Sequence, residues 1–362
     1  MTEPLSIGIV LHDFALGGTE RIAVRLASAW ARAGAKVTIF AGGGEGAMRA
    51  LLDPAVHVVV AEPSIPRGFG SRLRLGRAAA HYFARAPVGI CFLPGNFHWP
   101  VAPWLAALSP PPAIVAQVSA ALSKPQRPRW RQALFDRRMR RLLRWSDAVV
   151  TLSQAAADEA ERILGRPVVR AIPLPALPDV SEPPVPVPAD SKTIVAAGRL
   201  VPEKGFDLLI AAFAQLGDPE ARLVIVGNGP DETRLRGLVV QHGLEDRVAF
   251  PGYVADTRPW LDQARLFVLS SRFEGYPAVL IEALAAGRQV VATACTPAAT
   301  ELIDATSGRV VPIDDAGQMA DAIAGILASP PPWPAVLAAR VERHRIGPVA
   351  RAYLALFGEV AR

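Results

Sequence analysis

The chain has 362 residues, which is longer than one hydrophobic core usually serves, so two domains are expected. Hydrophobic residues make up 51% and charged residues 20%, which excludes a disordered protein, and two isolated cysteines exclude a disulfide framework or a thiolate zinc site. The net charge of +6 is uneven, because residues 1–180 carry 22 Lys and Arg against 12 Asp and Glu, whereas the remainder carries 17 against 21.

The N-terminal residues do not resemble a signal peptide, because Glu3 stands where such a peptide carries positive charge and no small-residue cleavage site follows a long apolar segment. Residues 86–123 contain no charged side chain, but their seven prolines exclude a membrane-spanning helix. We therefore expect a cytoplasmic protein.

The first elements along the chain predict a doubly wound α/β domain. An apolar run at Ser6–Val10 precedes a glycine pair, and the following apolar residues have helical spacing up to Gly34. A second apolar run at Lys36–Phe40 completes a strand, helix, strand unit, the building block of a parallel sheet. Further strands are expected at Val56–Ala61, Val88–Leu93, Ala113–Val118 and Ala148–Leu152.

A proline-rich segment separates this domain from a second one. Seven of the sixteen residues from Pro173 to Pro188 are proline, a composition typical of an extended connector. We predict a first domain over residues 1–175, a linker over 176–190 and a second domain over 191–344. A C-terminal helix at about 345–362 is predicted to pack back on the first domain.

The second domain repeats the alternation of strands and helices, which predicts another parallel Rossmann-like sheet. Its strands are expected at Thr193–Ala197, Arg222–Val226, Val248–Phe250, Leu266–Leu269 and Val290–Ala292, with helices at Phe206–Leu216 and Glu232–His242.

The segment FEGYPAVLIEALAAG carries two carboxylates, Glu274 and Glu282, eight positions apart. Pro277 favours the start of a helix after the strand, so the amides of Gly275 and Tyr276 would be free to bind phosphate near Glu274. The alternative is that both acids are solvated surface residues.

Two cations, Arg199 and Lys204, follow the first strand of the second domain in AAGRLVPEKGF. Ligands of open α/β sheets bind beyond the carboxyl ends of the strands, where this pair could neutralise a diphosphate. An ordinary solvated pair is the alternative.

A glycine turn, Gly17-Gly18, stands between the first strand and helix, with Thr19 expected as the N-cap. Residues without side chains allow a phosphate or sugar to approach the backbone closely. Such turns are common, and this one lacks the full dinucleotide-binding pattern.

Together these segments resemble the pattern of glycosyltransferase family 4. The matching motifs are GG-x-E-R at Gly17–Arg21, G-R-x4-K-G at Gly198–Gly205 and E-G-x-P-x4-E at Glu274–Glu282. The resemblance runs nearly end to end and implies a GT-B fold, with two Rossmann-like domains facing each other across a cleft. It implies that the first domain, 1–175, presents the acceptor and that the second, 191–344, holds the nucleotide-sugar donor. It also implies a retaining enzyme that moves a sugar from a nucleotide-sugar donor, such as a UDP- or GDP-sugar, to an acceptor hydroxyl.

The resemblance implies a role for each matching residue. The diphosphate would be held by Arg199 and Lys204, sugar hydroxyls by Glu274, and the ribose by Glu282. The remaining implied donor contacts are the amides of Gly275 and Tyr276 for phosphate, Gly17 and Gly18 for the sugar or distal phosphate, and Tyr253 and Val254 for the base.

The first domain departs from the family at one position, where Ser119 replaces a histidine that many members carry after the fourth strand. Ser119 and His98 are therefore the candidate acceptor or sugar contacts, although a lone histidine between Phe97 and Trp99 is more often a packing residue. No Asp-x-Asp motif is present, so we expect no metal and no cofactor beyond the nucleotide-sugar itself.

The basic segment 124–144 has nine Lys and Arg against one acid, interleaved with apolar residues, a composition that suits an anionic membrane surface. We expect a peripheral protein at the inner face of the cell membrane, with a glycan or lipid-linked acceptor from cell-surface polysaccharide or lipopolysaccharide-like biosynthesis. A solvated helix is the main alternative for this segment, and nucleic acid is not expected as a partner. Two other functions stay open for the chain, a GT-B-shaped nucleotide-sugar epimerase and an inactive nucleotide-sugar-binding scaffold.

Overall fold

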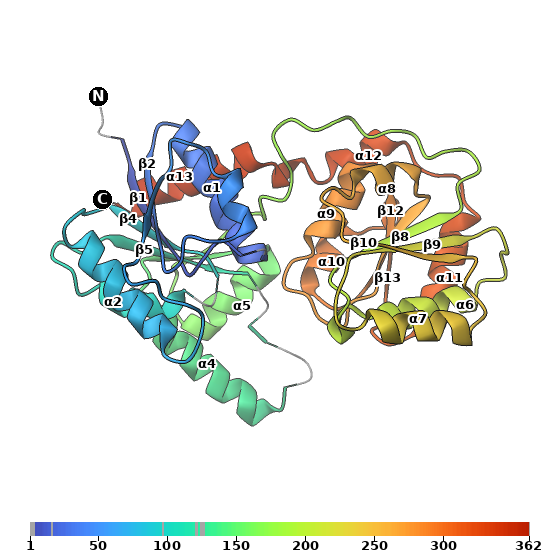
Figure 1. Cartoon of the computed structure of the whole chain (residues 1–362), viewed down its shortest axis with the longest axis horizontal. Helices are drawn as coiled ribbons and strands as arrows, with labels where there is room; N and C mark the ends of the chain where they lie inside the picture. Colours follow the sequence, from blue (N-terminus) through green and yellow to red (C-terminus); the bar gives the residue numbers. More distant parts are fainter. Residues whose placement is uncertain (1–3, 16, 96–97, 120–121, 124–126, 362) are drawn as a thin grey trace. The chain divides into compact units, whose positions relative to one another are not determined.

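The computed structural model describes residues 4–15, 17–95, 98–119, 122–123 and 127–361. Contacts divide the chain into two compact units, each built on a parallel sheet (Figure 1). The first unit extends to Asp179 and resumes at His344, and the second runs from Val180 to Arg343. The C-terminal residues therefore belong to the same unit as the N-terminal sheet.

Within the described residues, the sheet of the first unit has seven parallel strands in the order β3-β2-β1-β4-β5-β6-β7. They are β1 (Ser6–Leu11), β2 (Lys36–Ala41), β3 (His57–Val60), β4 (Ile90–Leu93), β5 (Ala113–Val118), β6 (Ala148–Thr151) and β7 (Val169–Ala171). The three-residue edge strand β7 was not predicted, because a run this short has no distinct periodicity.

Helices cover both faces of this sheet, and the alternation of side chains along β4 separates the two layers. Cys91 and Leu93 pack in the cluster formed with α2, α4 and α5, whereas Phe92 contacts Trp30 of α1 and Tyr353 of α13. The helices are α1 (Gly18–Arg32), α2 (Ser71–Phe83), α3 (Ala102–Leu105), α4 (Arg129–Leu143), α5 (Gln154–Leu164) and α13 (Ile346–Val360).

The C-terminal helix α13 is anchored to the first unit by an aromatic cluster. The ring centroids of Trp30 and Phe357 lie 5.0 Å apart, and the indole Nε1 of Trp30 donates to the carbonyl of Ala350 over 3.2 Å. On the same face, Gln117 Nε2 of β5 donates to the Tyr353 hydroxyl over 2.8 Å. Burying these large rings provides the stabilisation that holds a helix separated from the rest of its unit by residues 180–343.

The second unit has six parallel strands among the described residues, in the order β10-β9-β8-β11-β12-β13. They are β8 (Thr193–Ala197), β9 (Arg222–Val226), β10 (Val248–Gly252), β11 (Leu266–Leu269), β12 (Gln289–Thr293) and β13 (Gly308–Val311). The helices are α6 (Phe206–Ala214), α7 (Glu232–Gln241), α8 (Arg258–Gln263), α9 (Ala278–Ala285), α10 (Pro297–Leu302), α11 (Ala316–Leu327) and α12 (Pro334–Ala339). The prediction of a second parallel sheet is confirmed, although β13 was not predicted as a strand.

Both sheets reverse their strand order at one place, between β1 and β4 in the first unit and between β8 and β11 in the second. Connections on the two sides of such a switch point leave in opposite directions and open a crevice at the carboxyl ends of the strands. A ligand site is therefore expected at the loops that follow these four strands.

Removing one ring of the α13 anchor should destabilise the first unit. Phe357 is fully buried, so Phe357→Ala should lower the free energy of unfolding by about 3–5 kcal/mol. Phe69→Ala is the matched control, because Phe69 is fully exposed and its removal should change stability by less than about 0.5 kcal/mol. Urea unfolding followed by circular dichroism measures both, and equal losses would contradict the proposed anchor.

Candidate functional site

One predicted cation and one predicted acid of the second unit, Lys204 and Glu274, meet at its switch point. Lys204 ends the short 3₁₀ turn η3 (Pro202–Lys204) after β8, and Glu274 lies in the loop after β11. Lys204 Nζ donates to Glu274 Oε1 over 2.6 Å, and the two side chains are 26% and 13% exposed. Residues 70 positions apart in sequence thus form one partly buried ion pair.

Hydroxyl groups fix the orientation of this pair. Ser271 Oγ donates to the same Glu274 oxygen over 2.8 Å, and the Ser271 carbonyl accepts from Thr293 Oγ1 over 2.5 Å. Ser270 Oγ donates to the Lys204 carbonyl over 2.9 Å. The carboxylate and the ammonium group are therefore held in place before any ligand arrives, which is the arrangement a binding site needs.

Arg272 joins the same two loops on their outer side, a connection that the sequence did not reveal. Its amide donates to the Glu203 carbonyl over 2.8 Å, and its guanidinium donates to Asp207 over 2.8 Å and to Asp314 over 2.6 Å. The position of Arg272 two residues before Glu274 was the available signal, but its two acidic partners come from distant segments.

Gly205 permits the close approach of these loops. Its φ of 62° is in the left-handed region, and a Cβ atom there would lie 2.1 Å from the Ser270 carbonyl oxygen. Any other residue would force the loop that carries Lys204 away from the loop that carries Glu274.

Arg199 is exposed and follows β8 directly. In the part of the chain that the structure describes, its guanidinium makes no hydrogen bond or ion pair. Its N–H groups are thus available to an anion at the same end of the strand as Lys204, and guanidinium geometry suits phosphate oxygens.

Helix α9 begins at Ala278, with Pro277 as its N-cap residue. Its Glu282 accepts from Thr257 Oγ1 over 3.4 Å, and the Gly275 carbonyl before the helix accepts from Thr296 Oγ1 over 3.0 Å. Burial raises the pKa of Tyr276 to about 12, so its phenol stays protonated. The helix start lies in the loop after β11, where its amides can contribute to anion binding.

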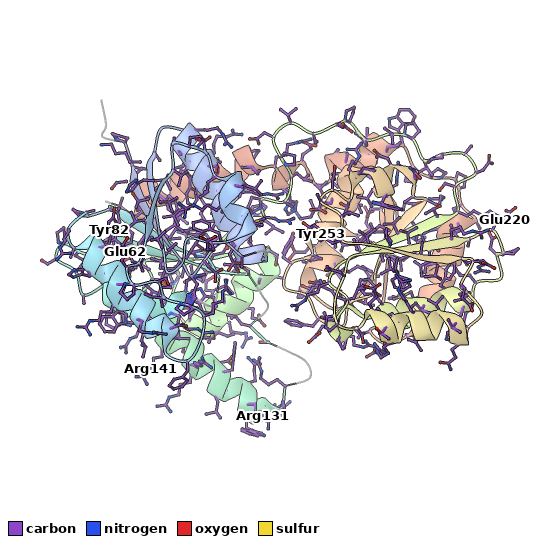
Figure 2. All side chains as sticks on the ribbon, in the orientation of Figure 1. Glu62, Tyr82, Arg131, Arg141, Glu220 and Tyr253 are labelled. Carbon is purple, nitrogen blue, oxygen red and sulfur yellow. The ribbon has the colours of Figure 1, made fainter. Side chains whose placement is uncertain are left out.

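Tyr253 and Val254 follow β10 at the same edge of the sheet. Tyr253 is 59% exposed, so its ring is open to stacking (Figure 2). The role of these two residues as contacts of the nucleotide base stays a prediction.

The glycine turn of the first unit differs in detail from the expectation. Helix α1 begins at Gly18 with Gly17 as its N-cap, so the prediction of Thr19 as N-cap is wrong. The Gly17 carbonyl accepts from the Arg21 amide over 3.0 Å, so the helical hydrogen bonds already begin at Gly17. A Cβ at Gly17 would lie 2.2 Å from Glu20 Oε2, so this position has no room for a side chain. Gly18 is exposed with no heavy atom within 4 Å of a Cβ position, which leaves room for a ligand.

His98 and Ser119 have different surroundings in the first unit. His98 is 1% exposed, and its Nδ1 lies 2.6 Å from the Pro94 carbonyl while Nε2 accepts from the His12 amide over 3.2 Å. Burial lowers the pKa of His98 to about 4, so the ring is neutral and links the ends of β1 and β4. This geometry favours the packing alternative. Ser119 is half-buried after β5, with Oγ 3.4 Å from Gln117 Oε1.

The described residues contain no cluster of three or more His, Cys, Asp or Glu side chains arranged to hold a metal ion. Neither do these segments include a helix that is long and apolar enough to cross a membrane.

Both units match known protein families. Residues 16–175 match the family described as Glycosyltransferase Family 4, and residues 191–329 match the one described as Glycosyl transferases group 1. The chain therefore belongs to the glycosyltransferases that these two descriptions cover, Glycosyltransferase Family 4 and Glycosyl transferases group 1. The two matches cover both units and include all three motifs that suggested the resemblance.

Curated relatives match shorter stretches. The lipopolysaccharide core biosynthesis glycosyltransferase LpsE of Rhizobium meliloti is 38% identical over 141 residues, 39% of this chain and 41% of the relative. A putative colanic acid biosynthesis glycosyltransferase, WcaL of Escherichia coli K12, is 38% identical over 152 residues, which are 39% of this chain and 37% of the relative. The chain thus spans about two fifths of the length of these relatives.

Solved structures share the fold across the whole chain. HepE of Anabaena, solved with UDP, superimposes with a TM-score of 0.78 at 19% identity over 98% of this chain and all of HepE. Sucrose-phosphate synthase from Thermosynechococcus elongatus gives a TM-score of 0.79 at 22% identity over 98% of both chains. The likeness extends over both parallel sheets and confirms the predicted GT-B fold class of two Rossmann-like domains.

Gly205 offers a direct test of how the site is built. Gly205→Ala should lower the free energy of unfolding by more than about 1 kcal/mol, because alanine is strained at this φ and its Cβ overlaps Ser270. Gly217→Ala, at an exposed glycine with no atom within 4 Å of a Cβ position, should leave stability unchanged or slightly higher. Urea denaturation compares the two, and an undisturbed Gly205→Ala protein would refute the tight loop contact.

Proposed function

We propose that this chain is a retaining, metal-independent glycosyltransferase that transfers a sugar from a UDP- or GDP-sugar to an acceptor hydroxyl. The observation that carries the proposal is the Lys204–Glu274 ion pair beside the exposed Arg199 at the switch point of the second unit. The fold of HepE, solved with UDP and with UDP-glucose, supports a nucleotide-sugar as the ligand.

In this proposal the two cations stabilise the diphosphate as it leaves. As the bond to the anomeric carbon breaks, negative charge grows on the leaving phosphate, and Arg199 and Lys204 stabilise it. Lys204 can do so while bound to Glu274, because an ammonium group has three N–H donors and Glu274 uses only one. This fixed positive charge takes the role that a metal ion would otherwise have at the diphosphate.

The acidic residues position the rest of the donor. Glu274 accepts hydrogen bonds from the hydroxyl groups of the transferred sugar, and Glu282 accepts them from the hydroxyl groups of the ribose. The amides of Gly275 and Tyr276 bind phosphate oxygens, Tyr253 and Val254 contact the base, and Gly17 and Gly18 lie against the sugar.

The proposed acceptor is a glycan or lipid-linked glycan of cell-surface polysaccharide or lipopolysaccharide-like biosynthesis. The names of LpsE and WcaL support this class, since both relatives are described as glycosyltransferases of such assembly. A lipid-linked acceptor requires the protein to work at a membrane surface.

Helix α4 supplies a surface suited to this task. Trp130 and Leu134 are 61% and 60% exposed, although large apolar side chains on a solvated helix normally turn inward. Six arginines of this helix are exposed as well, and Figure 2 labels two of them, Arg131 and Arg141. Arginines beside exposed Trp and Leu fit an anionic leaflet, so we place the protein at the inner face of the cell membrane.

Donor binding can be tested without knowing the acceptor. A thermal-shift screen of UDP-, GDP-, ADP- and dTDP-sugars should raise the unfolding temperature with one nucleotide series, because ligands stabilise the state that binds them. Lys204→Ala should abolish the shift. Lys192→Ala is the matched control, because Lys192 pairs with Asp218 and Glu220 at the other end of β8. This variant should retain the thermal shift. The absence of any shift would favour an inactive scaffold.

Membrane binding has its own test. Co-sedimentation with phosphatidylglycerol vesicles should weaken about fivefold or more in Arg141→Glu, because each basic residue near an anionic leaflet contributes about 1 kcal/mol. Arg351→Glu makes the same charge change at an exposed position of α13 and should bind like the wild type. Equal weakening in both variants would indicate net charge alone and contradict docking through α4.

A further inference from the structure

The second unit carries a row of alternating charges at the edge of the sheet where the candidate donor site lies. In the order of their contacts, the members of this charge belt are Asp231, Arg234, Asp207, Arg272 and Asp314. They come from the loops and helix starts that follow β9, β8, β11 and β13. The charge belt therefore joins four connections of the sheet at the edge where ligands of such sheets bind.

Arg272 is the centre of the charge belt. Its Nη1 and Nη2 donate to the two carboxylate oxygens of Asp207 over 2.8 and 3.1 Å, and its Nε donates to Asp314 over 2.6 Å. Arg234 extends the belt, because its guanidinium lies 3.7 Å from Asp207 and 2.6 Å from Asp231. One guanidinium group thus ties the loop after β11 to the start of α6 and to the loop after β13.

Arg272 also binds the main chain beside Lys204. Its amide donates to the Glu203 carbonyl over 2.8 Å, and its Nη1 donates to the Pro202 carbonyl over 2.9 Å. Glu203 directly precedes Lys204, and Glu274 lies two residues after Arg272. Arg272 therefore fixes the backbone of both segments that carry the ion pair, while its own guanidinium is bound to other partners.

The charge of Asp207 keeps Arg272 in this place. Burial alone would raise the pKa of the Asp207 carboxyl, but the hydrogen bonds from Arg272 outweigh burial and hold this pKa below its usual range. Asp207 is therefore ionised at neutral pH, although its side chain is only 24% exposed. Because a partly buried carboxylate without its cation is unfavourable, the loop after β11 is held where Arg272 can reach Asp207.

These contacts require the shape of a guanidinium group as well as its charge. The planar fork of Arg272 donates in several directions at once, to Asp207, to Asp314 and to the Pro202 carbonyl. A lysine ammonium is a point charge whose donors share one atom, so it cannot span the same three partners. The geometry of the charge belt thus depends on arginine at this position.

We propose that Arg272 is a positioning residue that holds Lys204 and Glu274 at the separation at which Lys204 can bind the diphosphate. Arg272 acts through the two loops and does not contact the ligand. Displacing a binding group by about 1 Å can cost roughly 100-fold in rate, so such a support matters to the reaction. The link to the diphosphate rests on the proposed function, whereas the fixing of the ion pair does not.

Competitive acetylation with acetic anhydride, read by peptide mass spectrometry, tests the fixing of the ion pair without any ligand. Relative to Lys192, Lys204 should be labelled about threefold or more faster in Arg272→Gln and in Arg272→Lys than in the wild type, because an ammonium group displaced from Glu274 is more accessible to the reagent. Glu274→Gln should give a similar increase, and Arg272→Gln should add little to it, because the two changes act on one interaction.

Two controls make this labelling specific. Lys192 is the internal standard, because it pairs with Asp218 and Glu220 at the other end of β8. Arg236→Gln removes an ion pair from an exposed arginine of α7 and should leave the labelling ratio unchanged. Circular dichroism verifies that the variants fold. A wild-type ratio in both Arg272 variants, an equal rise in Arg236→Gln or additive rises in the double variant would overturn the proposal.

Isothermal titration calorimetry with UDP and GDP measures the consequence for diphosphate binding. For the nucleotide that binds, the Kd should rise about tenfold or more in Arg272→Gln and in Arg272→Lys, and should stay unchanged in Arg236→Gln. Full rescue of the affinity by Arg272→Lys would assign the role to charge alone and would contradict positioning by geometry.

The two measurements separate this proposal from the proposed function. Faster labelling of Lys204 in the Arg272 variants, without binding of UDP or GDP by the wild type, refutes the donor site but retains the fixing of the ion pair. Nucleotide binding that is equal in the wild type and both Arg272 variants refutes the positioning residue and retains the donor site.

Discussion

The hydrogen-bonded ion pair between Lys204 and Glu274 is the interaction on which the candidate donor site depends. It joins the loops after β8 and β11 where the strand order reverses, and these are the loops that a switch point directs toward a ligand. Because the pair is partly buried, losing either partner would leave an uncompensated charge. Gly205 and Arg272 add two more connections between the same two loops.

The first unit is organised by a comparable tie between distant segments. The rings of α13 pack against Trp30 of α1 and Phe92 of β4, which closes one face of the sheet. At the carboxyl edge, Arg67 joins the loop after β3 to Asp13 and Glu20 of the loop and helix after β1. Main-chain contacts and one guanidinium group therefore hold this edge of the first unit together.

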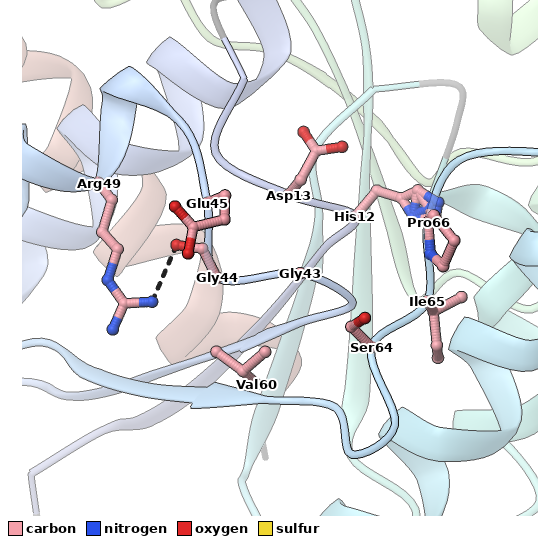
Figure 3. A pocket seen from close by; sticks show the side chains of 10 residues that line it. All are labelled: His12, Asp13, Gly43, Gly44, Glu45, Arg49, Val60, Ser64, Ile65 and Pro66. Carbon is pink, nitrogen blue, oxygen red and sulfur yellow. Dashed lines mark hydrogen bonds between the residues drawn. The ribbon is translucent and has the colours of Figure 1, made fainter.

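Much of the fold could be predicted from the sequence, because long apolar runs separated by helical periods are strong local signals. The proline-rich segment likewise indicated two domains, and the motif positions of Arg199, Lys204 and Glu274 placed them at strand ends. The structure adds what local patterns cannot contain. Arg272 finds acidic partners far along the chain, and the helical hydrogen bonds of α1 begin at Gly17, two residues before the predicted N-cap Thr19. A cavity of the first unit is likewise lined by the loops after β1, β2 and β3, which share no motif (Figure 3).

The most direct test of the account is the anomeric configuration of the product together with its dependence on the ion pair. The purified chain would be incubated with the nucleotide-sugar that stabilises it and a candidate acceptor glycan, and the anomeric proton of the product would be assigned by NMR. The account predicts transfer with retained configuration, and loss of most turnover in Lys204→Ala and Glu274→Ala while both variants remain folded. An inverted product, or wild-type turnover in both variants, would contradict it.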